Sequence, residues 1–288
     1  MRYLHISLAG LVALALLAGP VADGKTTCPA PPEQRLDVMT LLHSYIAGIR
    51  DSPDELIVAG IGNAYFLFDS NLDPVMPDEL AAVISSNARF GAAKQVVLAW
   101  SYSGWDKAPY LHAVEALLHK PVVGFSGPIW MYPDGAIIAS KAETSNIQGP
   151  NQSNVAQCIG MDGKYHDDRE CAAVLAAHDL SQGIFSNTLF VIPCSDIPQL
   201  EISAANGDGN ADMKLFFLNY FVNIDGDKAV QYLTKAASLG VPRANYLTAI
   251  MVRDTTPDGP SLYRQLLGRA AVGGDKKAAG ELAKLGAK

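Results

Sequence analysis

The chain has 288 residues, of which 49% are hydrophobic and 18% are charged, and its formal net charge is −7. This apolar content is enough for a buried core, which excludes an intrinsically disordered chain. The 22 Lys and Arg residues form no runs, so neither nucleic acid nor an anionic membrane surface is expected as a partner.

Residues 1–24 have the organisation of a secretory signal peptide. Arg2 and His5 form a polar start, and Leu8 to Leu17 is an apolar segment too short to cross a bilayer. Ala22-Asp23-Gly24 supplies small residues at a cleavage point, with earlier cleavage or a retained anchor as alternatives. We therefore expect a periplasmic or secreted bacterial protein without a membrane anchor after cleavage.

All four cysteines follow this segment, and an even number in an oxidising compartment predicts disulfides. Of the three possible pairings we favour Cys158–Cys171 and Cys28–Cys194, with free buried thiols as the alternative. No Cys-x-x-Cys pair occurs, so a structural zinc site is not expected. The segment Tyr165 to Glu170 contains His and carboxylate side chains that are potential metal ligands, but a solvated loop is the favoured interpretation, so no metal or cofactor is expected.

From about residue 28 to residue 195, apolar runs alternate with helical patterns. The helices are expected at 33–49, 77–84 and 108–119, and the buried strands at 55–60, 95–100 and 121–124. This alternation predicts an α/β domain with a mainly parallel sheet.

The second part of this domain is less regular. Residues 127–140 predict a hairpin with its turn at Pro133-Asp134-Gly135. The polar residues 149–168 predict a long loop, and the segment Tyr165 to Glu170 within and after it is expected to be solvated. A helix at 170–179, a strand at 188–192 and a linker at 193–198 are expected to follow.

The last third of the chain contains a regular spacing of small residues. Three segments read Ala204-x-x-Gly207-x-x-x-Ala211, Ala237-x-x-Gly240-x-x-x-Ala244 and Ala271-x-x-Gly274-x-x-x-Ala278, offset by 33 and then 34 residues. A period in the mid-thirties is typical of stacked helical hairpins. Alanine allows close helix approach, and glycine ends a helix where the backbone turns left-handed.

The segments AVQYLTKAASLGVPRANYLTAIM and LYRQLLGRAAVGGDKKAAGELAKLG within this region resemble Sel-one-like repeats, relatives of the tetratricopeptide repeats. The resemblance covers about residues 200–288 and implies an α-solenoid whose curved surface binds another protein. An ordinary alanine-rich helical bundle is the alternative.

The strand-to-turn segment Trp100-Ser101-Tyr102-Ser103-Gly104 is the strongest candidate for chemistry. Ligands of parallel sheets gather beyond the carboxyl ends of the strands, where Ser101 is placed like a nucleophile. Gly60-Ile61-Gly62 follows the preceding strand in the same way.

Residues 55–140 also resemble, more weakly, the caspase-like cysteine peptidase fold. The similar features are a strand that ends in Gly-x-Gly, the segment PDELAAVI, the segment WSYSG after the next strand, and then KPVVGFSGPIWMYPDGAI. Ile61 stands near the family's catalytic histidine position and Ser101 at its cysteine position. Without a thiolate and an activating histidine that chemistry fails, so the resemblance implies a non-catalytic copy, a pseudoenzyme.

The competing hypothesis is an exported serine hydrolase with Ser101 as nucleophile. A serine needs a base, and the candidates are His112, His119, His166 and His178. The first two lie on the helix that follows the serine, and each of the four is expected more readily on the surface or at a helix end. Both glycines of the usual Gly-x-Ser-x-Gly pattern are also replaced here.

Four aromatic residues flank the loops beyond the sheet, and they are interpreted either as the lining of a binding cleft or as core: Tyr102, Trp105, Trp130 and Tyr132.

The function that fits the features of the whole sequence is that of an exported adaptor or inhibitor that binds another protein through the helical repeats. In this interpretation the α/β domain is not an enzyme.

Overall fold

The computed structural model describes residues 38–50, 52–69, 73–105, 108–141, 150–151, 154–167, 169–179, 182–187, 192, 195–223, 225–253 and 258–286. Two compact units are present: Gln34–Val191 with Phe221–Ile224 form one, and Ile192–Tyr220 with Asp225–Lys288 belong to the other. The signal peptide, the Cys28–Cys194 pair and most of the strand expected at 188–192 lie outside the described residues.

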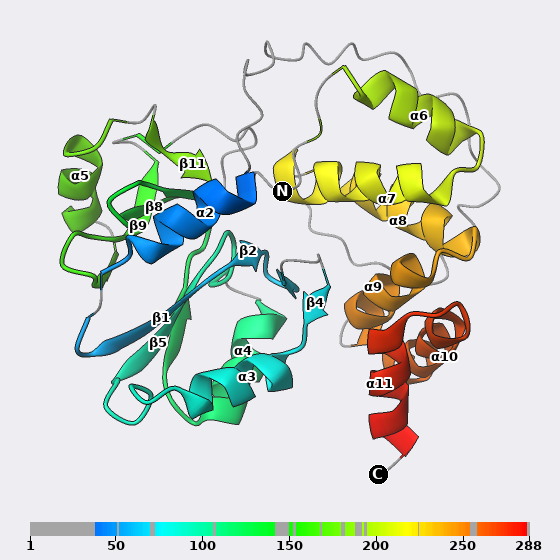
Figure 1. The fold of residues 1–288 in the computed structure, drawn as a ribbon, viewed down its shortest axis with the longest axis horizontal. Coiled ribbons are helices and arrows are strands. Elements are labelled where there is room, and N and C mark those ends of the chain that lie inside the picture. The colour runs from blue at the N-terminus through cyan, green and yellow to red at the C-terminus, as the bar shows by residue number, and fades with distance from the viewer. Residues whose placement is uncertain are drawn as a thin grey trace. The chain divides into compact units, whose positions relative to one another are not determined.

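The first unit contains the parallel sheet that the sequence predicts. Its strands are β1 (Glu55–Ala59), β5 (Gln95–Ala99) and β6 (Val122–Gly124), in the order β1-β5-β6 and all parallel. The helices α3 (Pro77–Ser86) and α4 (Pro109–Leu118) connect these strands and lie together on one face of the sheet (Figure 1). Both helices begin at proline, whose fixed φ suits the first helical position.

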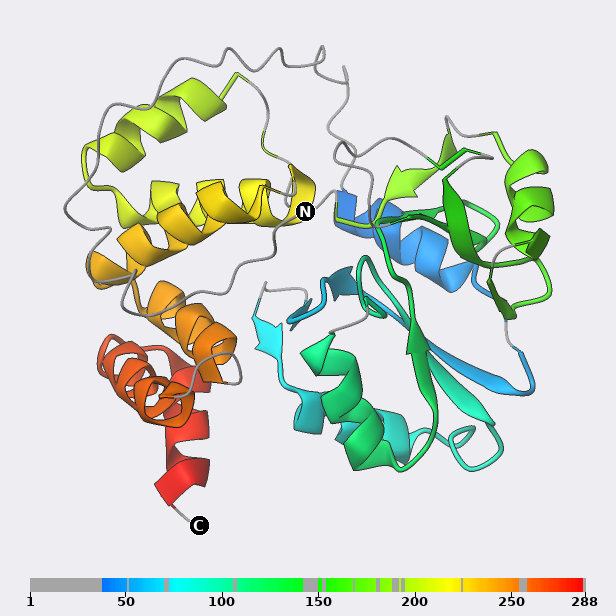
Figure 2. The same ribbon diagram turned by 180° about the vertical axis from the view of Figure 1, so that it is seen from behind.

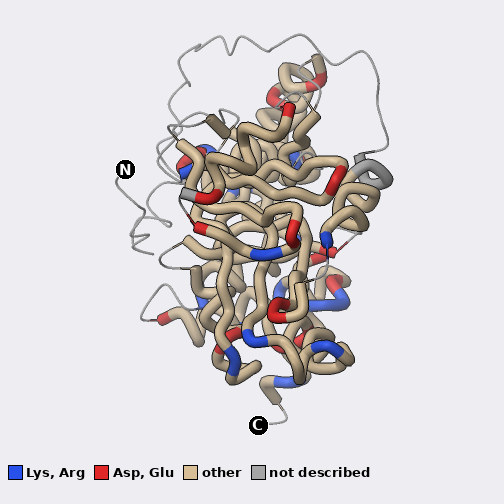
Figure 3. Tube along the Cα trace, turned by 90° about the vertical axis from the view of Figure 1, so that its left-hand side faces the viewer, with Lys and Arg blue, Asp and Glu red and all other residues tan. Residues whose placement is uncertain are grey.

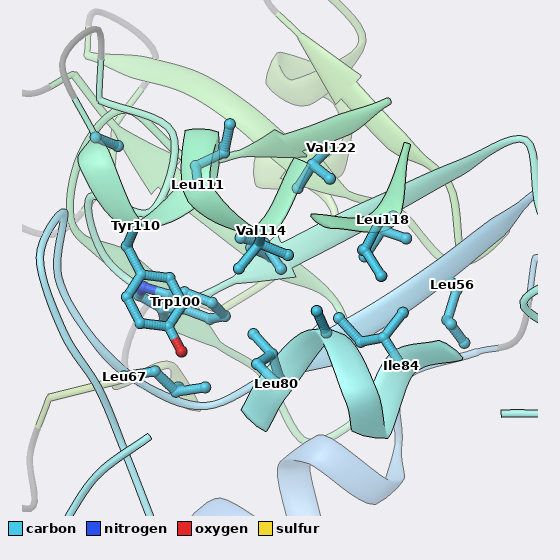
Figure 4. Close-up of a cluster of buried hydrophobic side chains, with 14 of the residues drawn as sticks. Leu56, Leu67, Leu80, Ile84, Trp100, Tyr110, Leu111, Val114, Leu118 and Val122 are labelled. Carbon is cyan, nitrogen blue, oxygen red and sulfur yellow. The ribbon is translucent and has the colours of Figure 1, made fainter. Parts of the chain in front are cut away.

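The core between these helices and the sheet is made of side chains at alternate strand positions (Figure 4). Val96, Leu98 and Trp100 point from β5 and its end toward the helices and are fully buried. The indole N–H of Trp100 donates to the carbonyl oxygen of Asn63, 3.0 Å away, so its one polar atom is satisfied.

A five-stranded antiparallel sheet follows. Its strands are β7 (Ile129–Met131), β8 (Ile137–Ser140), β9 (Val155–Ile159), β10 (Tyr165–Asp167) and β11 (Ile184–Phe185), in the order β10-β9-β8-β7-β11. The predicted parallel sheet is therefore present, but it has three strands, and the larger sheet of the unit is antiparallel. The β7–β8 hairpin confirms the prediction at 127–140, including its turn.

The expectation of a long loop at 149–168 is wrong, because β9 and β10 form a hairpin there. The polar composition of this segment predicted a loop instead of strands, because β10 is an edge strand whose three residues are half-buried or exposed. In β9 only Val155, Cys158 and Ile159 are buried. An edge strand tolerates polar side chains, so its composition is that of a loop.

Short elements complete the first unit. The helix α2 (Val38–Ala47) contacts β7, and α5 (Arg169–Ala176) packs on β8, β9 and β10 (Figure 1). A small antiparallel sheet is formed by β2 (Ile61–Gly62), β3 (Leu67–Phe68) and β4 (Pro74–Val75). The disulfide Cys158–Cys171 joins β9 to α5, as predicted.

The second unit is a run of helices that succeed one another along the chain (Figure 2). They are α6 (Ile197–Ala205), α7 (Gly209–Phe217), α8 (Gly226–Ser238), α9 (Pro242–Arg253), α10 (Gly259–Val272) and α11 (Lys276–Gly286). The π-helical segment η4 (Leu218–Val222) begins in this unit, and its last two residues are assigned to the first. The linker predicted at 193–198 ends early, because α6 already begins at Ile197. None of the helices in the described residues is long and apolar enough to cross a membrane.

The same turn joins α6 to α7, α8 to α9 and α10 to α11. Its glycine has a left-handed backbone each time, with φ of 89° at Gly207, 80° at Gly240 and 99° at Gly274. Each glycine N–H donates to the carbonyl oxygen three residues earlier, and the next N–H donates to the carbonyl oxygen five residues earlier, at 3.0 to 3.1 Å. This geometry ends a helix and satisfies its last carbonyl groups. The three periodic segments of the sequence are thus three equivalent turns.

Candidate functional site

The hydroxyl group of Ser101 lies in the interior of the first unit. The side chain is fully buried at the end of β5, and its Oγ is 2.8 Å from the Oγ of Ser186. It also accepts a hydrogen bond of 3.1 Å from the N–H of Ile129. Ser101 therefore joins the end of the parallel sheet to the first residue of β7 and to the turn after β11.

Ser103 has a similar role two residues later. It is 1% exposed, donates to the carbonyl oxygen of Leu98 at 2.6 Å and accepts from the N–H of Phe125 at 3.0 Å. The backbones of Gly104 and Gly124 approach so closely here that a Cβ on Gly104 would lie 2.3 Å from the carbonyl carbon of Gly124. Both serines thus hold the turns at the carboxyl edge of the sheet.

Tyr102, between these serines, has a left-handed backbone with φ of 62°. Side chains other than glycine rarely adopt this region, and the conformation costs on the order of 1 kcal/mol. The N–H of Tyr102 donates to the carbonyl oxygen of Gly127 at 2.9 Å. That hydrogen bond helps to hold the strained turn, which presents its neighbour Ser101 inward.

This geometry does not favour Ser101 as a nucleophile. Neither Ser186 nor a backbone N–H is a base that removes a proton from a hydroxyl group. None of the hydrogen bonds of the described histidines reaches Ser101. The caspase-like assignment stays a prediction, and Ile61, at its expected histidine position, is a buried residue of β2.

The four candidate histidines lie in other settings. His112 is exposed on α4, with Nδ1 3.9 Å from Glu115. His119 follows α4 with a left-handed backbone and φ of 50°. His166 lies in β10 between Asp162 and Glu170. His178 contacts Asp134, and this pairing, 44 residues apart in sequence, was not foreseen.

The aromatic candidates are not gathered on one surface. Trp130 is 8% exposed and Tyr132 is 1% exposed, and both belong to the core between the five-stranded sheet and α5. Trp105 packs against the other core, beneath α3 and α4. Trp130 and Tyr132 pack against Cys171 and Leu175 of α5, which cover them, and only the tertiary structure reveals this.

Burial has a strong effect on the phenol of Tyr132. Burial first, and then the charges of Asp134 and Asp179, raise the pKa of Tyr132 to about 12. Its hydroxyl group has no hydrogen-bond partner in the described structure, and its ring lies 4.8 Å from the ring of His178. Tyr132 is therefore neutral at every physiological pH.

The second unit offers exposed side chains at equivalent positions of successive hairpins. Gln231 on α8 and Gln265 on α10 are both exposed and occupy the same position relative to their turn glycines. A hollow of about 470 Å³ opens on α10, lined among the described residues by Pro260, Ser261, Arg264 and Gln265. Such a surface combines hydrogen-bonding amides with a guanidinium group.

Side-chain contacts join α8 to the preceding hairpin. Lys235 on α8 donates to the carbonyl oxygen of Ala204 at the end of α6, and its Nζ lies 3.5 Å from the carboxylate of Asp212 on α7. Asp212 is fully buried, and burial raises its pKa despite the opposing charge of Lys235. Asn245 is the equivalent residue of the next hairpin and is also buried.

Charges of both signs are interspersed along the chain (Figure 3). In the described part of the protein, no group of three or more His, Cys, Asp or Glu side chains is arranged to hold a metal ion.

Searches of protein-family models, of curated proteins and of solved structures find no match to this chain.

Proposed function

We propose that the protein is an exported bacterial adaptor or inhibitor that binds another protein through the surface of its helical hairpins. A secreted toxin or a component of the cell envelope is the kind of partner that export implies. The α/β unit is a non-catalytic companion in this proposal. The resemblance to Sel-one-like repeats supports it, as does the predicted signal peptide.

The observation that carries the proposal is the equivalence of the three turns. Helices α6 to α11 contact one another in chain order, and each hairpin has the same left-handed glycine and the same pair of backbone hydrogen bonds. Hairpins that pack only on their neighbours leave a long face available, and repeat proteins use such faces to bind proteins.

The serine hydrolase is not proposed as a second function. Ser101 is buried, and its hydroxyl group hydrogen-bonds to Ser186 and to the backbone of Ile129. Both contacts join elements of the fold, which supports a structural role.

Affinity capture with matched surface variants tests the proposal. The chain from Lys25 onward is used as bait for envelope and culture fractions of the source cell, either unchanged or with Arg264→Glu and Gln265→Lys. Both side chains are exposed on α10, so these changes alter the surface without creating a cavity. A protein captured in stoichiometric amount is expected to bind the double variant at least about tenfold more weakly, as hot-spot residues do.

The control carries Lys94→Glu, a charge reversal on the first unit at a side chain that is 76% exposed. It is expected to bind as the unchanged chain does. Equal binding by the unchanged chain and the α10 variant, or capture lost only in the Lys94 variant, argues against the helical surface. If the unchanged chain captures nothing, the adaptor proposal fails.

A further inference from the structure

The charged residues of this chain are unevenly distributed. Residues 226–288, which contain α8 to α11, have ten Lys and Arg against five Asp and Glu, a net charge of +5. Residues 1–225 have twelve Lys and Arg against 24 Asp and Glu, a net charge of −12. A positive region attracts negatively charged partners. The second and third hairpins are therefore the part of the chain that suits an acidic partner.

Most of the cations in these hairpins are engaged within the unit, but two on α10 are not. Four of them contact an anionic or aromatic side chain: Lys228 with Asp225, Lys235 with Asp212, Lys284 with Glu281 and Arg253 with Tyr263. Arg264 and Arg269 are exposed, and within the described residues neither guanidinium group has an ion pair or a hydrogen bond. Their charge is therefore available to a partner.

The two arginines belong to one exposed strip of α10. Side chains three and four residues apart are neighbours on a helix, so Ser261, Arg264, Gln265, Arg269 and Val272 follow one another along it. These five residues, the α10 strip, are all exposed, and Val272 is 92% exposed. At 1.5 Å per residue the strip is about 16 Å long. The core is contacted by the other face of α10, which carries Tyr263, Leu266, Leu267 and Ala270.

The strip is open and has the groups that bind a peptide. The hollow of about 470 Å³ lies along its first half, where Ser261, Arg264 and Gln265 line it. A Cβ on Gly268 would meet nothing within 4 Å, so the surface stays open toward Val272. A guanidinium group binds a carboxylate through two parallel hydrogen bonds, and amide and hydroxyl groups pair with a peptide backbone.

The spacing of the two arginines matches an extended segment. They are five residues apart, which is a rise of about 7.5 Å along the helix axis. In an extended chain, side chains two residues apart point to the same side and lie about 7 Å from each other. Two carboxylates at such positions can each face one arginine, and an apolar side chain beyond them can cover Val272.

We propose that the α10 strip binds an extended acidic segment of a partner protein. Two carboxylates of that segment, two residues apart, pair with Arg264 and Arg269, and an apolar side chain packs on Val272. This inference rests on the proposed function and makes it specific, because it names the helix that binds and the chemistry of the bound segment. Two separated arginines beside an amide and an apolar side chain do not form the basic cluster typical of sites for nucleic acid or anionic lipid.

Selection from a library of displayed random heptapeptides tests the inference. The bait is the intact chain from Lys25 onward, and the selected peptides are expected to contain two acidic residues two positions apart with an apolar residue nearby. One selected peptide is then titrated against the unchanged chain and against Arg264→Glu with Arg269→Glu. The variant is expected to bind at least about fivefold more weakly, because repulsion replaces two exposed ion pairs.

Lys94→Glu with Lys164→Glu is the matched control. Both side chains are exposed on the first unit, and this double change alters the net charge by the same amount. It is expected to bind the peptide as the unchanged chain does, which separates a local contact from the effect of total charge. Unchanged thermal midpoints in both double variants are expected, because the four side chains are exposed.

Several outcomes overturn the inference: no selected peptide, selected peptides without acidic residues, or equal binding by the α10 variant. Arginine-dependent binding to phosphatidylglycerol vesicles, to single-stranded RNA or to a second copy of the chain, without binding of acidic peptides, also overturns it.

The affinity capture described above separates this inference from the proposed function. If a captured protein binds the unchanged chain and the Arg264→Glu, Arg269→Glu variant equally, the adaptor proposal stands and the acidic segment is wrong. If nothing is captured although acidic peptides bind through the two arginines, the adaptor proposal fails and the α10 strip is still a peptide-binding site.

Discussion

The two units of this protein use their small and polar residues in different ways. In the first unit each contact is made once: Ser101 joins two sheets, and Gly135 allows one close approach of two backbones. In the second unit one arrangement occurs three times, at Gly207, Gly240 and Gly274. A single contact leaves no periodic trace in a sequence, whereas a repeated one does, and this difference decides which unit can be interpreted from sequence.

Gly135→Ala is expected to have the largest effect. Gly135 has φ of 85°, and a Cβ there would lie 2.0 Å from the carbonyl oxygen of Gly48. Both the strain and the clash with backbone atoms act on this site, so a loss of roughly 4 kcal/mol in unfolding free energy is expected. Chemical denaturation measures it, and a loss below roughly 1 kcal/mol would show that the two backbones separate easily.

Ser101→Ala comes next. The change leaves the buried Ile129 N–H without its partner and removes one of the two hydrogen bonds of the Ser186 hydroxyl, which still donates to Asn187 Oδ1, so a cost of about 1–3 kcal/mol is expected. Ser238→Ala is the control, because that hydroxyl group is exposed and contacts only the carbonyl oxygen of Lys235. Unchanged stability in Ser101→Ala would contradict the structural role and return Ser101 to consideration as a reactive residue.

Gly240→Ala isolates the left-handed backbone. Its φ is 80°, and a Cβ would meet nothing within 4 Å, so only the strain of about 1–2 kcal/mol is expected. Gly268→Ala is the matched change within α10, where the space is also open and no left-handed backbone is present. That variant is expected to gain about 0.5–1 kcal/mol. Thermal unfolding measures both variants. An equal change of stability in Gly240→Ala and Gly268→Ala would show that the left-handed backbone of Gly240 carries no special cost.

Asp212→Asn is expected to have the smallest effect. Burial raises the pKa of Asp212, so its ionisation at neutral pH lowers the free energy of unfolding. This loss of stability disappears once the pH has fallen below the pKa that Asp212 has in the unfolded chain. Removing the charge is expected to raise the unfolding midpoint by about 2–4 °C at pH 7 and by less near pH 3. Asn245 shows that an amide fits the equivalent position. A lower midpoint at pH 7 would mean that the contact with Lys235 outweighs burial.

The parallel strands and the β7–β8 hairpin were predictable because their signals are local. Continuous apolar runs predict β1 and β5, and Pro133-Asp134-Gly135 predicts a turn. The β9–β10 hairpin was missed because an edge strand with half-exposed side chains has the composition of a loop. The Cys158–Cys171 pair was predicted from an even cysteine count and a short separation.

The candidate site shows the limit of local signals. The sequence places Ser101 after a strand, as a nucleophile would be, and places Trp130 near a loop. Ser101 is buried by contacts with Ile129 of β7 and Ser186 after β11, and Trp130 is buried by packing with α5 and β11, all distant in sequence from the side chain they cover. The His178–Asp134 contact joins residues with no local relation, so no spacing predicts it.

The sequence by itself determined the alternation of the first strands and helices and the three turn glycines, because each depends on residues within one element or one turn. The Cys158–Cys171 disulfide joins two elements, and it was predicted from the cysteine count and the polar segment that it closes. Only the tertiary structure decided which polar side chains are buried, how the second sheet is ordered and where α5 is fastened. These properties depend on which distant segments pack together, and packing is set by the summed burial of many side chains.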